Sequence, residues 1–363
     1  MSFFNNIYQR CRVFVTGHTG FKGTWLCALL DKLGAQTIGF SDQQRSVPCH
    51  FELLNLPTIH QQGDIRDYSH LRNVIQEYRP KIVFHLAAQP LVSRSYNDPL
   101  ETFSTNVLGT ANLLQAVREC GSVKATVVIT TDKVYENKES EQGYRETDVL
   151  GGYDPYAASK ACAEQVVGSF RQSFYESEGK LLASCRAGNV IGGGDWTEER
   201  LIPDLVRAAA KNGAAVIRMP QAVRPWEHVL EPLAGYLQLG QRLLEGKTEF
   251  AEAWNFGPDV SGHETVGEIV RLASRSWKKI KIASTTSPTR LHETTLLKLD
   301  CTKARHRLNW KPVWNLQQTV EKTVEWYREY YEHGEILTRE QLETYLEDAR
   351  QAGAIGLSIW HGL

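Results

Sequence analysis

The chain has 363 residues, of which 42% are hydrophobic, and its 41 basic and 42 acidic residues leave a net charge of −1. This balance excludes the basic excess typical of proteins that bind nucleic acid or an anionic membrane, and we see no apolar stretch suited to a signal peptide or a membrane span. The seven cysteines include no Cys-x-x-Cys pair and the eleven histidines form no metal-binding motif, so we expect reduced thiols, a cytoplasmic location and no metal site.

Short apolar runs alternate with amphipathic segments from about residue 12 to residue 190. We expect strands at 12–17, 36–41, 59–64, 81–87, 125–132 and 181–190, and helices at 23–34, 68–78, 100–120 and 156–174. Strands with few polar residues, separated by helices, are typical of a parallel sheet covered on both faces. We therefore predict an α/β fold built on a doubly wound parallel Rossmann sheet, with the ligand site at the carboxyl ends of the strands.

The pattern loosens after residue 190. We expect helices at 201–213, 231–246, 265–277 and 316–334, and short strands at 216–220, 253–258 and 279–284. We predict a dinucleotide-binding Rossmann domain over 1–190, a smaller α/β substrate-capping region over 191–334 and a helical tail over 335–363. Thr338 would cap the tail's helix, with Gln341 three residues on, and Trp360 could pack back on the body.

A glycine pattern joins the first predicted strand to the first predicted helix. Gly17, Gly20 and Gly23 would let the backbone turn sharply and approach a pyrophosphate resting on the helix N-terminus. The spacing differs from the common G-x-G-x-x-G, and a tight turn without a ligand is the alternative. Ala87 and Ala88, just after the fourth strand, suit a cofactor passing over that edge, although core packing explains small residues almost as well.

Acidic residues follow the second and third predicted strands. Asp42 could bind a ribose 2′-hydroxyl, but Ser41 competes for that position and Arg45 leaves the choice between NAD and NADP open. Asp64 could meet the adenine amino group. An ordinary turn role is equally compatible with either carboxylate.

The strongest chemical signal combines the end of the fifth strand with the following helix. Tyr156 and Lys160 are four positions apart, so they share a helix face, and the lysine charge would lower the phenol's pKa from ~10 toward neutrality. Such a phenol can take a hydroxyl proton. Thr131 could hydrogen-bond the reacting oxygen, and Asp132 is a candidate general acid if burial keeps it protonated. A solvated helix pair, and an Asp132–Lys133 ion pair that only caps the strand, are the alternatives.

Cationic and polar side chains are spread over the chain after residue 185. Several arginines in a capping region suit a diphosphate, which guanidinium groups bind bidentately, whereas each one alone could be a surface charge. The candidates are Arg186, Asn189, Arg218, Arg224, Arg290, His292 and Glu293.

The ordered motifs GxxGxxG, HLAAQ, NVLGT, TDKVY, YAASK, RAGNVIG and WNFGP resemble the extended short-chain dehydrogenase/reductase family over nearly the whole chain. Within it, GHTGFKGTWL, TTDKVYEN, RPWEHVLEPLAGYL and HETTLLKLD are similar to the nucleotide-sugar 4,6-dehydratases that act on CDP-glucose. The resemblance implies NAD as cofactor, CDP-glucose as substrate, and loss of water to give a 4-keto-6-deoxy sugar that feeds the 3,6-dideoxysugars of bacterial surface polysaccharide.

The resemblance also implies roles for individual residues. Tyr156 would take the C4 hydroxyl proton with Lys160 lowering its pKa, Thr131 would hold the C4 oxygen, and Asp132 would protonate the leaving C6 hydroxyl. The implied cofactor contacts are Gly17, Gly20, Phe21, Gly23, Asp42, Asp64, Ile65, Ala87, Ala88, Tyr156 and Lys160, and the implied substrate contacts are Arg94, Asn189, Arg218, Arg224, Arg290 and His292. A homodimer or homotetramer, paired through the helices near 100–119 and 156–177, is implied as well.

One departure from the family pattern concerns the base that removes the C5 proton. Relatives acting on dTDP- and GDP-sugars carry glutamate where this chain has Lys133. A lysine can be a base only if its pKa falls below its usual ~10.4; otherwise Lys133 would stabilise the enolate while Glu136 or a water takes the proton.

Two rival functions use parts of the same residue set. A nucleotide-sugar 4-epimerase needs Tyr156, Lys160 and NAD but no paired acid and base. A catalytically silent NAD-binding sensor would not need the set of Thr131, Tyr156 and Lys160 at all.

Overall fold

A parallel sheet forms the centre of the computed structural model, which describes residues 3–42, 46–283 and 294–354. The strands are β1 (Arg12–Thr16), β2 (Gln36–Ser41), β3 (Ile59–Gln62), β4 (Ile82–His85), β5 (Ala125–Ile129), β6 (Leu181–Ala187), β7 (Asn189–Ile191), β8 (Val223–His228), β9 (Ala253–Phe256) and β10 (His263–Thr265). The helices are α1 (Phe21–Lys32), α2 (His50–Leu54), α3 (Tyr68–Tyr78), α4 (Val92–Asn97), α5 (Pro99–Phe103), α6 (Gly109–Arg118), α7 (Pro155–Phe170), α8 (Leu201–Ala210), α9 (Leu230–Leu244), α10 (Val266–Ser276), α11 (Leu316–His333) and α12 (Thr338–Gln351).

The main sheet has seven strands in the order β3-β2-β1-β4-β5-β6-β9, and every pairing in it is parallel. The order reverses between β1 and β4, where Val13 pairs with Thr37 on one side and Ile82 on the other. This is the doubly wound arrangement, and its reversal point is where such sheets bind ligands. The Rossmann prediction is confirmed, and all residues of β4 and β5 are buried because helices cover both faces.

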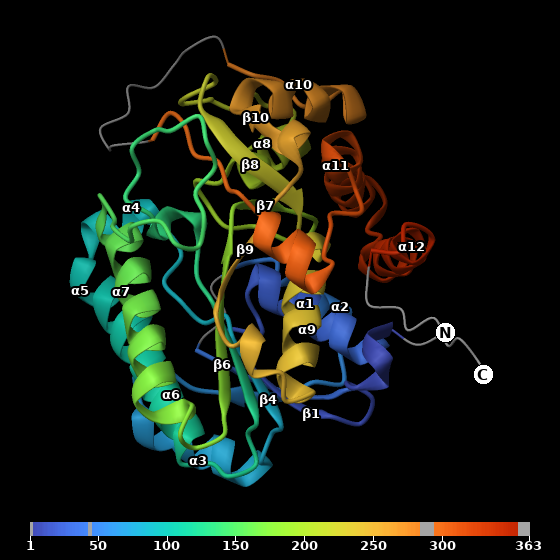
Figure 1. Ribbon diagram of the computed structural model, residues 1–363. Helices are drawn as coiled ribbons and strands as arrows, with labels where there is room; N and C mark the ends of the chain where they lie inside the picture. The colour runs from blue at the N-terminus through green and yellow to red at the C-terminus, as the bar shows by residue number, and fades with distance from the viewer. Residues whose placement is uncertain (1–2, 43–45, 284–293, 355–363) are drawn as a thin grey trace.

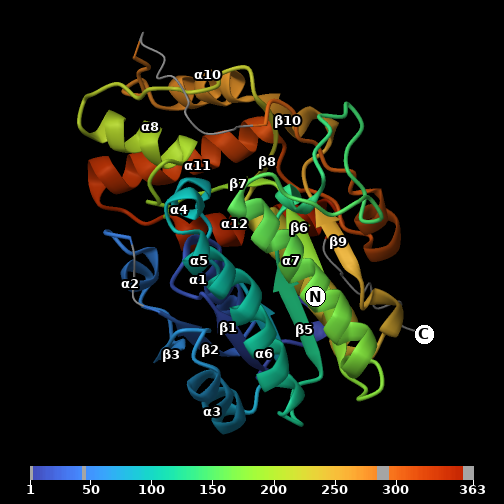
Figure 2. The same cartoon turned by 90° about the vertical axis from the view of Figure 1, so that its left-hand side faces the viewer.

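The helices form a layer on each side of the sheet (Figures 1 and 2). Phe14 and Val128 belong to the core shared with α3, α6 and α7, whereas Val13 and Val15 belong to the core shared with α1 and α9. Alternate side chains along β1 thus enter opposite cores, as the two-residue period of a strand requires. In the part of the chain that the structure describes, no helix is long and apolar enough to cross a bilayer.

The capping elements gather at one end of the sheet (Figure 1). There β10, β8 and β7 form a small sheet, with α8, α10 and α11 beside it. The range after residue 190 also returns to the main sheet, because β9 pairs with β6 and α9 packs against β5 and β6. The strands predicted at 216–220 and 279–284 are wrong over the described residues 216–220 and 279–283, where one isolated bridge joins Ala215 to Ile282. The domain boundaries at 190 and 334 stay predictions.

The start of α12 differs from the prediction that Thr338 caps it. Leu337 occupies the cap position and Thr338 lies inside the helix. The Thr338 hydroxyl is buried instead between His50, 2.7 Å from Nε2, and Trp326, whose Nε1 donates to it at 2.9 Å. Two buried ring nitrogens compete successfully for the hydroxyl that would otherwise cap the helix. Trp360 lies outside the described residues.

A buried ion pair links α7 to β6. Arg186, which the sequence allowed as a diphosphate ligand, pairs with Glu164 at 2.9 Å, with side chains only 4% and 3% exposed. The Glu164 carboxylate also accepts hydrogen bonds from Thr130 and Ser184. The pair therefore ties the helix that carries Tyr156 to the strands beneath it.

Removing one partner of this ion pair leaves a buried charge without compensation. We expect Arg186→Met to lower the free energy of unfolding by about 3–5 kcal/mol, measured by urea denaturation. Arg145→Met, which breaks a pair with Asp300 whose arginine is 71% exposed, is the control and should cost at most about 1 kcal/mol. Equal losses in the two variants would show that burial does not set the strength of the Arg186–Glu164 pair.

Candidate active site

One cavity of about 1450 Å³ opens where the carboxyl ends of the main sheet meet the capping elements. It brings together the catalytic, cofactor and substrate candidates of the described part of the chain, whereas Arg186 lies outside it in the buried ion pair with Glu164. They are Gly17, Gly20, Phe21, Gly23, Asp42, Asp64, Ile65, Ala87, Ala88, Arg94, Thr131, Asp132, Lys133, Tyr156, Lys160, Asn189, Arg218 and Arg224. Arg290, His292 and Glu293 lie outside the described residues.

The glycine turn between β1 and α1 is packed too tightly for side chains. A Cβ on Gly23 would lie 2.1 Å from the carbonyl oxygen of Gly17, and a Cβ on Gly17 would lie 2.7 Å from the amide nitrogen of Ala87. Gly17 also has a φ of +70°, which favours glycine. Gly20 caps α1 without a side-chain hydrogen bond, and no acidic residue occupies the first turn. The N–H groups in the first turn of α1 can therefore donate hydrogen bonds to an anion, so this turn fits the diphosphate of a dinucleotide.

The two acidic residues expected near the adenosine have different surroundings. Asp42 is exposed at the cavity, directly after Ser41, whose hydroxyl contacts the side chains of His18 and Thr19. The Ser41 hydroxyl is therefore hydrogen-bonded within the chain, while Asp42 presents a carboxylate at the cavity. Asp64 is paired with the guanidinium of Arg66 through both carboxylate oxygens, so its charge is partly neutralised.

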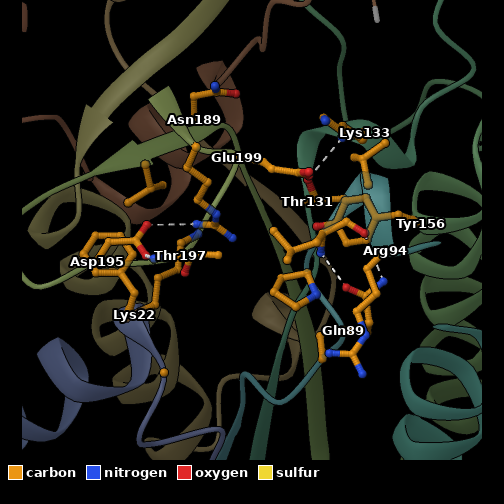
Figure 3. A pocket seen from close by; sticks show the side chains of 18 of the residues that line it. Lys22, Gln89, Arg94, Thr131, Lys133, Tyr156, Asn189, Asp195, Thr197 and Glu199 are labelled. Carbon is orange, nitrogen blue, oxygen red and sulfur yellow. Dashed lines mark hydrogen bonds and ion pairs between the residues drawn. The ribbon is translucent and has the colours of Figure 1, made fainter. Parts of the chain in front are cut away.

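Two elements bring the catalytic candidates together. Thr131, Asp132 and Lys133 follow β5, and the last two begin a short 3₁₀ turn. Helix α7, capped by Asp154 with Pro155 in its first turn, supplies Tyr156. Figure 3 shows Thr131, Lys133 and Tyr156 on one side of the cavity. The Lys133 ammonium lies 6.0 Å from the centroid of the Tyr156 ring, a distance at which a cation still interacts with an aromatic ring.

The Asp132 carboxyl has the environment of a general acid. Its residue is 2% exposed, and burial raises its pKa although the Lys133 charge and a hydrogen bond from Thr131 act in the opposite direction. The Thr131 hydroxyl donates to Oδ1 at 3.0 Å, and Oδ2 has no hydrogen-bond partner among the described residues. Burial therefore favours the protonated form of this carboxyl, which is the form that a general acid requires.

The expected lowering of the Tyr156 pKa by Lys160 is wrong for the protein chain by itself. Burial raises the pKa of Tyr156 to about 12, and the largest opposing influences are the Thr131 hydroxyl and the Arg200 charge. Lys160 donates to the carbonyl oxygen of Ile129 at 3.3 Å, and burial lowers its own pKa to about 8. The Lys160 ammonium is therefore directed at β5, and it loses its proton more readily than an exposed lysine.

Sequence reasoning missed several side chains around the cavity. Lys22, in the first turn of α1, lines the cavity, and burial lowers its pKa to about 8. Arg200 pairs with Asp195 at 3.3 Å, and Asp195 lies across the cavity from Tyr156 (Figure 3). Glu227 on β8 does not line the cavity, but its charge acts on Lys22; it is 2% exposed, and neither of its carboxylate oxygens has a hydrogen-bond partner among the described residues. The motif GHTGFKG could have drawn attention to Lys22, but no local pattern marks the other three.

The candidate substrate arginines are partly engaged within the chain. Arg94 forms a bidentate pair with Glu101, both hydrogen bonds measuring 2.7 Å. Arg218 and Arg224 donate to backbone carbonyl groups. All three line the cavity beside Asn189. Among the described residues, no three His, Cys, Asp or Glu side chains are placed to hold a metal ion.

Comparison with known proteins decides the family. The sequence profile of GDP-mannose 4,6 dehydratase matches residues 14–323. The chain belongs to this family. Its members are extended short-chain dehydrogenases/reductases, so the resemblance found in the motifs is confirmed. A CDP-glucose 4,6-dehydratase of Salmonella typhimurium is 47% identical over 350 residues, which cover 94% of this chain and 98% of the relative. A UDP-glucose 4-epimerase of Rhizobium leguminosarum is 26% identical over 88% of this chain and 98% of its own.

Solved structures show the same family fold. An epimerase of Methanothermobacter thermautotrophicus superposes with a TM-score of 0.80 at 25% identity, over 93% of this chain and 96% of its own. A dTDP-glucose 4,6-dehydratase of Bacillus anthracis, solved in complex with NAD, has a TM-score of 0.75 at 22% identity, over 89% of this chain and 98% of its own. The shared fold extends over the capping elements as well as the main sheet.

The protonation state of Tyr156 can be tested directly. Because burial raises its pKa to about 12, we expect the ligand-free protein to keep Tyr156 as a neutral phenol from about pH 7 to about pH 10. The measurement is the difference in ultraviolet absorbance between the wild type and Tyr156→Phe during titration. A phenolate band unique to the wild type within that range would contradict the expectation.

Proposed function

We propose that this protein is an NAD-dependent CDP-glucose 4,6-dehydratase, which converts CDP-D-glucose to CDP-4-keto-6-deoxy-D-glucose and water. The observation that carries the proposal is that Tyr156, Thr131 and Asp132 line one cavity beside a diphosphate-binding turn. They do so in a chain 47% identical to a CDP-glucose 4,6-dehydratase. An epimerase needs no buried carboxyl at position 132, so the raised pKa of Asp132 favours dehydration.

The cofactor would lie along the edge of the sheet from β3 to β5. The glycine turn and the N-terminus of α1 would bind its diphosphate, with Phe21 and Ile65 beside it and Ala87 and Ala88 allowing close approach. Asp42 would accept a hydrogen bond from a ribose hydroxyl and would repel a 2′-phosphate, which favours NAD over NADP. Bound NAD supplies a hydride acceptor for C4 and a hydride donor for C6.

The side chains would handle the protons. The Tyr156 oxygen takes the C4 hydroxyl proton, assisted by Lys160, while Thr131 holds the C4 oxygen. The resulting ketone acidifies the C5 hydrogen, which a base near Lys133 removes. Asp132 gives its proton to the C6 hydroxyl, which leaves as water, and C5 finally regains a proton. The low exposure of Thr131, Asp132 and Tyr156, at 7%, 2% and 9%, supports exclusion of bulk water from these steps.

The capping residues would recognise the nucleotide diphosphate. Arg94, Asn189, Arg218 and Arg224 lie in the same cavity, and guanidinium groups bind diphosphates through paired hydrogen bonds. Arg290 and His292 are proposed from the resemblance alone.

We also propose a homo-oligomer, a homodimer or homotetramer, working in the cytoplasm on a route to bacterial 3,6-dideoxysugars. Leu100 and Leu108, at 81% and 62% exposed next to α6, support a contact surface there. The buried apolar residues of α6 and α7 pack on the sheet instead. The seven cysteines are free thiols, which supports a reducing compartment.

The proposal is tested by incubating the protein with NAD and CDP-, dTDP-, GDP- or UDP-glucose, then analysing products by mass spectrometry and NMR. We expect a 4-keto product that has lost one water, formed most efficiently from CDP-glucose. Inversion at C4 without loss of water would assign an epimerase. No turnover with any of the four sugars would favour a binding protein.

The role of Lys133 in the C5 step is a separate prediction. If Lys133 takes part, Lys133→Met should slow incorporation of solvent deuterium at C5 by about 10²-fold or more while C4 oxidation stays nearly intact. Glu136→Gln is the control, because Glu136 lines the cavity but is 55% exposed in a pair with Lys138. Unchanged elimination in Lys133→Met, with a slow Glu136→Gln, would move the base to Glu136.

A further inference from the structure

A chain of four hydrogen-bonded side chains runs from the cavity wall to the surface of the protein at the carboxyl end of β2. The Thr19 hydroxyl lies 2.9 Å from that of Ser41, which lies 3.0 Å from Nδ1 of His18. Nε2 of His18 in turn lies 2.8 Å from Nδ1 of His60. Thr19 and Ser41 line the cavity, whereas His60 is exposed on β3. The chain therefore connects the cavity to the surface through one buried imidazole.

The His18 ring at the centre of the chain is held tightly. It is 0% exposed, and it lies against Gly39 of β2, where a Cβ would be only 2.2 Å from the ring. An edge-to-face contact with Phe51 places the two ring centroids 4.9 Å apart. Burial and the neighbouring His60 lower the pKa of His18 to about 3, so the imidazole is neutral at the pH of the cell. A neutral imidazole has a single N–H.

The single N–H gives the chain a direction. If His18 donates to His60, the Ser41 hydroxyl must donate to His18. Ser41 then accepts the proton of Thr19, which presents only lone pairs to the cavity. If His18 donates to Ser41 instead, His60 must donate to His18. One proton of the Ser41 and Thr19 hydroxyls is then left over from their mutual hydrogen bond and is directed at the cavity.

The two directions suit different cofactors. The carboxyl end of β2 is where a Rossmann fold binds the adenine ribose. NAD brings two ribose hydroxyl protons to this place, whereas the 2′-phosphate of NADP brings acceptor oxygens and negative charge. The first direction suits NAD, because Thr19 accepts a ribose hydroxyl beside the Asp42 carboxylate. The second direction turns a hydroxyl proton toward the ribose and suits a phosphate.

We propose that the His18–His60 pair selects NAD over NADP by drawing the hydroxyl protons of the chain away from the adenine ribose. His60 accepts through Nδ1 and fixes the direction of the chain from outside the cavity. The two histidines are positioning residues, because they act on the cofactor through Ser41 and Thr19. The inference rests on the proposed NAD-dependent function and adds to the effect of the Asp42 charge.

The test replaces the acceptor at the outer end of the chain by a side chain that only donates. His60→Arg obliges His18 to accept at Nε2 and to donate to Ser41. The measurement is the ratio of the dissociation constants of NADP and NAD, obtained by calorimetry. We expect this ratio to fall by about tenfold, the effect of about one hydrogen bond. His60→Lys should act in the same way, and an unchanged ratio in both variants would overturn the proposal.

The matched control is His60→Gln, whose amide oxygen can still accept from His18, so the ratio should stay as in the wild type. The arginine charge also attracts a 2′-phosphate directly, and Ser41→Ala separates this effect by breaking the chain while position 60 keeps its charge. We expect most of the His60→Arg effect to be lost in the Ser41→Ala background. An equal fall of the ratio in both backgrounds would assign the effect to charge alone and refute the chain.

A spectroscopic readout follows the proton on His18 itself. Nitrogen chemical shifts distinguish Nδ1–H from Nε2–H in a histidine, and the His18 signals are assigned by their absence in His18→Asn. We expect the proton on Nε2 in the NAD complex of the wild type and on Nδ1 in that of His60→Arg. A wild-type proton on Nδ1, or no change in His60→Arg, would contradict the proposed direction. A wild type that binds no NAD would instead refute the proposed function, so the two failures are distinguishable.

Discussion

Burial of polar groups at the end of β5 is the constraint on which the rest of this structure depends. Thr131, Asp132 and Tyr156 are almost fully covered, so the charged form of each acid is disfavoured and both pKa values rise. Desolvation suits the carboxyl, which must hold a proton, and opposes the phenol, which must lose one. Ionisation of Tyr156 therefore depends on what occupies the cavity, because the chain by itself favours the neutral phenol.

The scaffold maintains this burial by tying its parts together beneath the cavity. The Arg186–Glu164 pair lies under α7 and joins it to β6, while hydroxyls from β6 and from the end of β5 complete the carboxylate's hydrogen bonds. Above the sheet, the capping elements close the cavity and then return through α9 and β9. Because the same range of chain builds both the cap and the sheet, cap and catalytic groups share one core rather than two.

The family supplies a scaffold on which several reactions are carried out, since relatives of this chain include both dehydratases and epimerases. Shared fold alone therefore does not determine the reaction. Here the distinguishing feature is local: a buried carboxyl, Asp132, accepts a hydrogen bond from Thr131 in the cavity that Tyr156 also lines.

The sequence by itself determined six strands of the main sheet, most helices and many of the residues that line the cavity. Those features rest on local periodicity and on motifs such as the glycine turn, whose physical demands act within a few residues. Only the tertiary structure decided the partners of those residues: Arg186 pairs with Glu164, Lys160 faces Ile129, and Thr338 bonds His50 rather than capping its helix. It also revealed Arg200 and Glu227 near the site and the membership of β9 in the main sheet. Burial and hydrogen-bond partners depend on segments far apart in the chain, and no local pattern carries that information.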